Sequence, residues 1–165
     1  MSFYNRKRMR LKDYDYSQEG MYYLTICTKN KRKLFSEIEN NRVKLNQFGE
    51  IIDHTLNDLT NHNNIIIHNY VIMPNHIHVL IQICREQSVT VPEKSISEIV
   101  RQFKGFSSKR INTLLIRNGY EPFHTGELWQ KSFYDHIIRN ENEFINKWKY
   151  IDRNPIKWEL DDLYV

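Results

Sequence analysis

The run from Asn64 to Ile83 constrains the fold most, because it contains two apolar, β-branched segments with almost nothing between them. The first segment is NIIIHNYVIM, the second is HIHVLIQI, and only Pro74 and Asn75 separate them. Segments of this composition are typical of strands, and a Pro-Asn pair favours a tight turn. The sequence therefore predicts two antiparallel strands, over residues 64–73 and 76–83, that are neighbours in one sheet.

The other periodic segments surround this pair with one more strand and three helices. The aromatic and β-branched run MYYLTICT over residues 21–28 predicts a strand. Apolar residues spaced three and four apart predict helices over residues 46–59, 95–117 and 140–154. We expect this order to give an α+β fold: a ferredoxin-like antiparallel sheet with helices packed on one face, plus a C-terminal helix.

Length and composition favour one independent domain. The chain has 165 residues, of which 40% are apolar, so it can bury a core of its own. Its apolar runs are far shorter than the ~18 residues of a spanning helix, and its basic N-terminus lacks the apolar segment of a signal peptide. We therefore expect a cytoplasmic protein with a basic arm over residues 1–20 and a single domain over residues 21–165. Cys27 and Cys84 lie in strand-like runs and are expected to be buried thiols.

Two histidines share one face of the second predicted strand. His76 and His78 are two residues apart, and alternate residues of a strand point to the same side, whereas Ile77 points to the other. Two imidazoles on one face can bind a divalent metal ion. An exposed polar strand face is the alternative interpretation of so short a motif. A metal site would need at least one more ligand.

A tyrosine and an asparagine are paired on the last predicted helix. Tyr150 and Asn154 lie four residues apart, which places them on one helical face. The amide oxygen is an acceptable ligand for Mg²⁺ or Mn²⁺, and the phenol is a possible nucleophile. A tyrosine that covers the core and a polar residue before Pro155 would show the same spacing. By itself the pair is consistent with either role.

Positive charge is gathered in three clusters, although the formal net charge is only +4. Basic side chains interleaved with aromatic ones suit a nucleic acid, whose phosphates attract the cations and whose bases stack on the rings. Ordinary solvated surface is the alternative. The clusters are Arg6, Lys7, Arg8, Arg10 and Lys12; Lys29, Lys31, Arg32 and Lys33; and Arg101, Lys104, Lys109 and Arg110.

Four strings occur in a recognisable order: YVIMPNHIHVLI, ISEIVRQFKGFSSKRIN, LWQKSFYDHIIRNENEF and YIDRNP. Together they resemble the single-tyrosine transposases of the HUH endonuclease superfamily, and within its insertion-sequence 200-like group the REP-associated tyrosine transposases most of all. The resemblance extends from Met21 to Lys157. The joint match in order and spacing is more specific than any single motif.

The resemblance implies a set of site residues. His76 and His78 match the metal-binding histidines, Tyr150 matches the nucleophile, and Asn154 matches the third ligand of a divalent Mg²⁺ or Mn²⁺ ion. In relatives outside the REP-associated group the position of Asn154 is usually Gln, so Asn favours that subgroup. His136, in the segment DHIIR, is expected to support the site without a defined role. The chain ends in IKWELDDLYV, where relatives often have a run of small residues.

The resemblance also implies an activity on DNA. Tyr150 would attack a phosphate of single-stranded DNA at a REP-like hairpin, forming a covalent 5′-phosphotyrosine and releasing a 3′-hydroxyl. The metal would polarise that phosphate. We expect a monomer in the prokaryotic cytoplasm, associated with the nucleoid. The expected DNA contacts are Arg6, Lys7, Arg8, Arg10, Arg101 and Lys104.

Two other functions compete with this one. A non-catalytic module that binds single-stranded nucleic acid or hairpins would use the same basic and aromatic residues, but it would not need both histidines, Tyr150 and Asn154. A metal-dependent nuclease that activates water would need more carboxylate ligands than this set offers. We therefore expect a DNA strand transferase.

Overall fold

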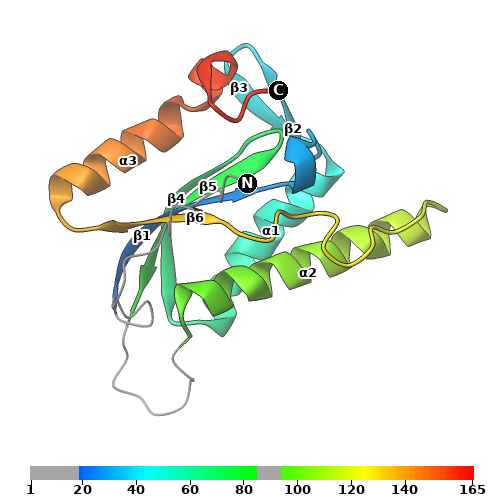
Figure 1. Ribbon diagram of the computed structural model, residues 1–165, viewed down its shortest axis with the longest axis horizontal. Coiled ribbons are helices and arrows are strands. Elements are labelled where there is room, and N and C mark those ends of the chain that lie inside the picture. Colours follow the sequence, from blue (N-terminus) through cyan, green and yellow to red (C-terminus); the bar gives the residue numbers. More distant parts are fainter. Residues whose placement is uncertain (1–18, 85–93) are drawn as a thin grey trace, which may run out of the picture.

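Four antiparallel strands form the central sheet in the order β4-β5-β1-β6 (Figure 1). The computed structural model describes residues 19–84 and 94–165. The strands are β1 (Gly20–Cys27), β4 (Ile65–Ile72), β5 (His76–Ile83) and β6 (Tyr134–Ile138). Three of them match strands expected from the sequence.

The predicted pair of strands is β4 and β5, and it is antiparallel as expected. Ile72 lies opposite Ile77, and Met73 N donates a hydrogen bond to His76 O at 2.9 Å, which closes the Pro-Asn turn. On its other edge β5 pairs with β1, with Thr25 opposite His78. The histidine strand is therefore an inner strand of the sheet.

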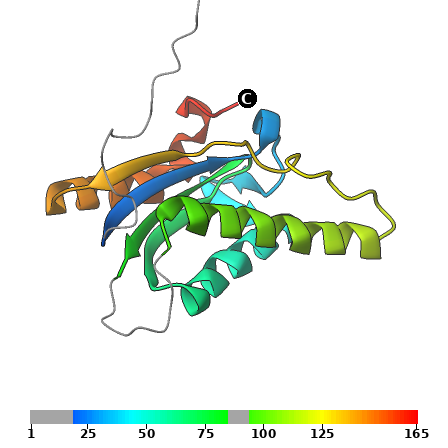
Figure 2. The same ribbon diagram turned by 60° about the horizontal axis from the view of Figure 1, so that its bottom comes forward.

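Helices cover both faces of this sheet (Figure 2). The first two, α1 (Gln47–His62) and α2 (Ile96–Arg117), pack on one face, and α3 (Glu141–Arg153) packs on the other. This arrangement confirms the expected α+β fold with a separate C-terminal helix. Within the described residues, no helix is long and apolar enough to cross a membrane.

Local sequence signals set the helix ends. Asn46 caps α1, accepting hydrogen bonds from the amides of Phe48 and Gly49, and Ser95 and Glu98 form a capping box at the start of α2. At the end of α3, Pro155 begins a short 3₁₀ segment, η2 (Pro155–Leu160). The chain therefore turns sharply just after the predicted Tyr-x-x-x-Asn pair.

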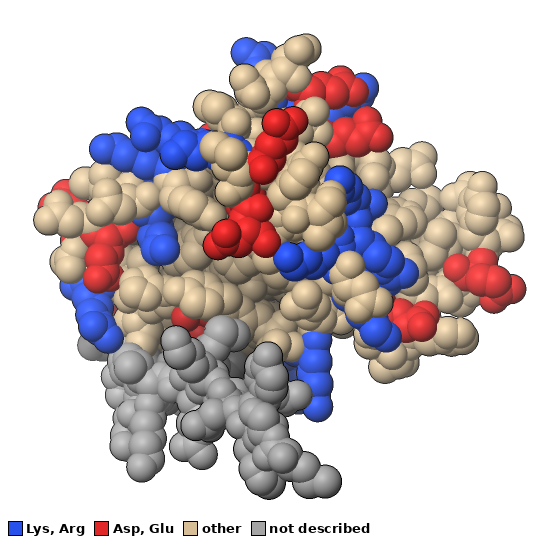
Figure 3. All heavy atoms as spheres, turned by 45° about the horizontal axis from the view of Figure 1, so that its top comes forward, with Lys and Arg blue, Asp and Glu red and all other residues tan. Residues whose placement is uncertain are grey.

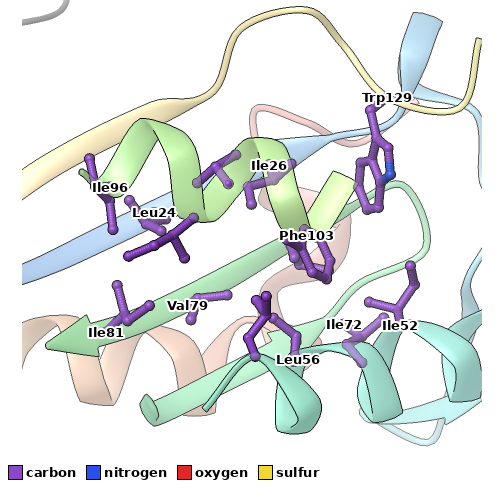
Figure 4. Close-up of a cluster of buried hydrophobic side chains, with 14 of the residues drawn as sticks. Leu24, Ile26, Ile52, Leu56, Ile72, Val79, Ile81, Ile96, Phe103 and Trp129 are labelled. Carbon is purple, nitrogen blue, oxygen red and sulfur yellow. The ribbon is translucent and has the colours of Figure 1, made fainter. Parts of the chain in front are cut away.

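Strand alternation divides the apolar residues into two clusters of unequal size. The larger lies between the sheet and the helices α1 and α2, and Figure 4 shows side chains from all these elements interlocking with Trp129. The smaller lies under α3 and consists of Tyr23, Leu80, Ile138 and Ile151. Along β5, Ile77 faces the larger cluster and Leu80 the smaller, so the two histidines of this strand face α3.

Three strands were not predicted. The segments β2 (Ser36–Glu39) and β3 (Arg42–Leu45) form a separate two-stranded hairpin, and β6 forms the edge of the main sheet beside β1. The expectation of two buried cysteines was wrong, since both are partly exposed and no disulfide joins them. Cys27 is exposed because it borders a hollow on the α3 face, and Cys84 because it follows the end of β5.

Candidate active site

The histidine pair is buried between the sheet and the C-terminal part of the chain. His76 is 0% exposed and His78 is 3% exposed, so the alternative of an exposed polar strand face is wrong. Their Nε2 atoms are 3.0 Å apart. Trp158 covers His76, with ring centroids 5.9 Å apart, and Tyr150 covers His78 at 5.4 Å. The two imidazoles thus converge on one point near α3 and η2.

Neighbouring side chains orient both rings. His76 Nδ1 lies 2.8 Å from Asn75 Oδ1, which can only accept, so Nδ1 carries the proton and the Nε2 lone pair faces His78. His78 Nδ1 lies 2.7 Å from Tyr23 Oη and 2.9 Å from Thr25 Oγ1. Because hydroxyl groups can donate or accept, they allow His78 to carry its proton on either nitrogen. With its proton on Nδ1, His78 leaves its Nε2 lone pair free, and both Nε2 atoms can then bind a shared cation.

Burial lowers the pKa of both histidines, because a charged imidazole loses its hydration there. For His76 this desolvation brings the pKa to about 4, and for His78 the nearby His76 and Lys147 lower it further. Both rings are therefore neutral at physiological pH. Neutral imidazole is the form that binds a metal ion.

We expect the metal-free protein to lose stability as the pH falls from about 6.5 toward 4. The unfolded state binds protons at the two histidines that the folded state does not, so their contribution is complete above the ordinary pKa of 6.5 and is lost below it. Each histidine can contribute up to about 1.4 kcal/mol per pH unit. Chemical denaturation of wild type and of a His76→Gln/His78→Gln variant between pH 7.5 and 5 measures this. Equal pH slopes in the two proteins would contradict the prediction.

Asp161 brings a carboxylate oxygen to the two histidines, and Asn154 is bonded to that carboxylate. Asn154 is 4% exposed, and its Oδ1 is buried without a hydrogen-bond partner among the described residues. Its Nδ2 donates to Asp161 Oδ2 at 3.0 Å. The ligand atoms of His76, His78 and Asp161 all lie within 4.8 Å of one another. A buried carbonyl oxygen without a partner is costly unless something binds it, so this donor set fits a divalent metal ion.

Tyr150 lies beside this cluster on the surface of α3. It is 46% exposed, and its Oη donates to Asp161 Oδ2 across a long 3.5 Å contact. Partial burial, and next the Asp161 carboxylate, raise the pKa of the Tyr150 phenol. The phenol is therefore protonated in the free protein at neutral pH, with its oxygen accessible to a ligand.

Asp161 was not singled out from the sequence. It ends η2, where its amide donates to Trp158 O at 3.1 Å and its Oδ1 accepts from Leu163 N at 2.7 Å. Its distance in sequence from Asn154 is seven residues with a proline and a helix end between them, so no regular period connects the two. Only the three-dimensional path of η2 brings this carboxylate to the site.

The structure places His136 outside this cluster. It lies on β6, and its Nε2 is 3.4 Å from a carboxylate oxygen of Glu143, which also accepts from the amide of Arg139 at 3.0 Å. His136 therefore joins β6 to the start of α3.

Two hollows flank Tyr150. The first has a volume of about 500 Å³ and is lined by residues of the sheet, including Tyr23, Thr25 and Tyr134. The second has about 430 Å³ and is lined by three basic residues of α3 and η2, namely Lys149, Arg153 and Lys157. Aromatic rings on one side and cations on the other are suited to the bases and phosphates of a single strand.

The expected DNA contacts are only partly described. Arg6, Lys7, Arg8 and Arg10 lie outside the described residues, and Arg101 is exposed on α2. Lys104 Nζ donates to the carbonyl oxygens of three consecutive residues, Gln130 to Ser132, at 2.7 to 3.4 Å, and burial lowers the pKa of Lys104 to about 8. Its ammonium group therefore holds the loop before β6 rather than facing solvent.

Acidic and basic side chains are mixed on the face that carries η2 and the C-terminal end (Figure 3). Tyr150 and Asp161 line both hollows, Asp162 lines only the first, and Lys149 and Arg153 line only the second. A nucleic acid bound here would therefore contact cations along a defined path rather than a uniformly basic surface.

Comparisons with known proteins identify the family of this chain. The family model described as "Transposase IS200 like" matches residues 16–154, so Asp161 lies beyond the match. An uncharacterized protein of Haemophilus influenzae is 35% identical over 178 residues, covering 98% of this chain and 94% of that protein. A second H. influenzae protein, named "Putative REP-associated tyrosine transposase", is 21% identical, covering 87% of this chain and 74% of that protein.

One solved structure shows the same fold. It is the structure of a REP-associated tyrosine transposase bound to a REP hairpin, with a TM-score of 0.63 and 19% sequence identity. The alignment covers 90% of this chain and 74% of that chain. The arrangement of sheet and helices is therefore shared with a protein whose structure contains a REP hairpin.

Proposed function

Because the chain belongs to the IS200-like transposase family, we propose that it cleaves and rejoins single-stranded DNA at REP-like hairpins through a covalent bond to Tyr150. The observation that carries this proposal is the convergence of His76, His78 and Asp161 beside a half-exposed tyrosine, with Asn154 bonded to Asp161. The relative named for REP association and the hairpin-bound structure support hairpin DNA as the substrate.

His76, His78 and Asn154 would hold a divalent ion, Mg²⁺ or Mn²⁺, and Asp161 would add a carboxylate to the set. Nitrogen and oxygen donors of this kind suit such ions. When bound, the metal supplies Lewis-acid polarisation of the scissile phosphate. Asn75 and the hydroxyls of Tyr23 and Thr25 fix the orientation of the two imidazoles.

Tyr150 performs the covalent step. Its Oη gives the phenolic proton to solvent and forms a bond to phosphorus, while the bond from phosphorus to the 3′ oxygen breaks and that oxygen takes up a proton from solvent and leaves as a hydroxyl. The phosphotyrosine ester conserves the phosphodiester bond energy, so a 3′-hydroxyl can reverse the step and rejoin the strand. Asp161 accepts the hydrogen bond from Oη in the free protein and so directs the phenol toward the metal ligands.

The complete set of site residues comes from one chain, which supports a monomer as the active unit. His76, His78, Tyr150 and Asn154 are contributed by β5, α3 and the residue that follows α3. No second copy is needed to complete the donor set.

The direct test uses a labelled single-stranded hairpin oligonucleotide with Mn²⁺ and a denaturing gel. We expect a labelled species that migrates with the protein after denaturation, together with a free 3′-hydroxyl fragment. Cleavage without this adduct would favour a nuclease that uses water. Binding without cleavage would favour a hairpin-binding module.

DNA binding is expected to weaken steeply with salt, and the N-terminal arm over residues 1–20 is proposed to carry much of this dependence. Neutralising Arg6, Lys7, Arg8 and Arg10 together should lower both the affinity and the slope of log K against log salt. Each lost contact to a single strand lowers the slope by about 0.7. Fluorescence anisotropy with a hairpin at several salt concentrations measures both quantities. An unchanged slope after deletion of residues 1–12 would contradict this assignment.

A further inference from the structure

A lysine ammonium group borders the hollow beside Tyr150, and Glu143 is the acidic residue whose charge acts on it. Lys147 is three residues before Tyr150 and seven before Asn154, so α3 carries a cation, the proposed nucleophile and a proposed metal ligand along one face. Lys147 Nζ is 4.4 Å from the ring centroid of Tyr23 and 5.8 Å from that of Tyr150. Among the described residues, no carboxylate forms a salt bridge with it.

The other nearby cations are engaged or lie elsewhere. Lys104 donates to three backbone carbonyls, and Lys31 Nζ donates to Asp162 O at 3.0 Å. Lys149 lines the second hollow. Among the described residues that line the first hollow, Lys147 is the only lysine or arginine.

The surroundings of Lys147 strengthen its attraction for an anion. Its ammonium group lies over the ring of Tyr23, and desolvation lowers the pKa of that group. An ion pair in such a partly water-excluded hollow is stronger than one on open surface. Two carboxylates, Asp161 and Asp162, line the same hollow and would repel a phosphate. A phosphate that reaches Tyr150 from this side therefore needs a compensating positive charge.

We propose that Lys147 binds a non-bridging oxygen of the scissile phosphate and stabilises the negative charge that accumulates on it while Tyr150 attacks. This inference rests on the proposed function. His78 and Asp161 of the proposed metal site line the same hollow as Lys147 and Tyr150, so a phosphate bound there is within reach of both the metal site and the ammonium group. Lys147 keeps its proton throughout, because the bond to phosphorus forms from Tyr150 Oη and the electron pair of the broken bond goes to the 3′ oxygen.

The test compares Lys147→Met with Lys147→Arg in single-turnover cleavage of a hairpin oligonucleotide at saturating protein and Mn²⁺. Methionine keeps an unbranched apolar side chain at this position and removes the charge. We expect the Met variant to cleave about 100-fold more slowly, as for loss of one transition-state charge contact, with hairpin Kd within threefold of wild type. The Arg variant should cleave at least about tenfold faster than the Met variant.

A matched control is Lys44→Met, which removes the same charge from an exposed residue paired with Glu39 on the β2–β3 hairpin. It should cleave at the wild-type rate. A Met variant within threefold of wild type, or an Arg variant no faster than Met, would overturn the role of Lys147. If the wild-type protein forms no adduct, the proposed function is wrong. If the wild-type protein forms the adduct and the Lys147 variants behave as described above, only the role of Lys147 is wrong.

Discussion

Tyr150→Phe is expected to abolish the covalent protein–DNA adduct and strand cleavage while leaving hairpin affinity within about twofold of wild type. The substitution removes only the phenolic oxygen, and the ring keeps its contacts with Tyr23 and His78. Tyr150 Oη has one long hydrogen bond, to Asp161, so its loss costs little stability. The denaturing-gel assay measures the adduct, and anisotropy measures binding.

Tyr134→Phe is the matched control, because Tyr134 lines the same hollow, is also exposed and has its ring 6.5 Å from that of Tyr23. We expect it to form the adduct at the wild-type rate. Persistence of the adduct in Tyr150→Phe would assign the nucleophile to another tyrosine.

His78→Ala is expected to weaken Mn²⁺ binding at least about 100-fold and to destabilise the fold by about 2–4 kcal/mol. The loss of metal binding follows from removing one of two converging imidazoles. The loss of stability follows because His78 is buried, stacks on Tyr23 with ring centroids 5.4 Å apart, and bonds the hydroxyls of Tyr23 and Thr25. Calorimetric titration with MnCl₂ and chemical denaturation measure the two effects.

His78→Gln separates these effects, since an amide can still bond the hydroxyls. We expect it to recover part of the stability and little of the metal affinity. Unchanged Mn²⁺ affinity in His78→Ala, together with the loss of stability, would mean that the histidines stabilise the fold and do not bind the metal.

The features predicted from the sequence are those with a clear local period. The alternation around His76 and His78 is a property of one strand, and the four-residue spacing of Tyr150 and Asn154 is a property of one helix. The turn at Pro74 is signalled by two adjacent residues. Strand β6 was not predicted because it is only five residues long, its sequence YDHII has no clear alternation of apolar and polar residues, and it follows a long irregular segment. The β2–β3 hairpin was missed because its strands are four residues each and largely charged.

The burial of the site could not be predicted in the same way. The sequence pattern around a histidine on an inner strand is the same whether its side chain faces water or a helix. His76 and His78 are buried because α3 and η2 pack on this face of the sheet. Asp161 reaches the site because η2 reverses the chain after Pro155, which no residue spacing encodes. Packing between distant segments therefore decides both the neutrality of the histidines and the carboxylate beside them.

The unequal division of the apolar core determines which part of the protein unfolds locally first. The larger cluster holds β1, β4 and β5 to α1 and α2, whereas the apolar anchors of α3 in the smaller cluster are Ile151 and Phe144, and Ile145 and Trp148 are exposed. Local opening of a weakly anchored element costs less than global unfolding. The amides of α3 should therefore exchange with solvent earlier than those of β5, and heating should inactivate the protein by dislodging the tyrosine helix before the rest of the fold melts.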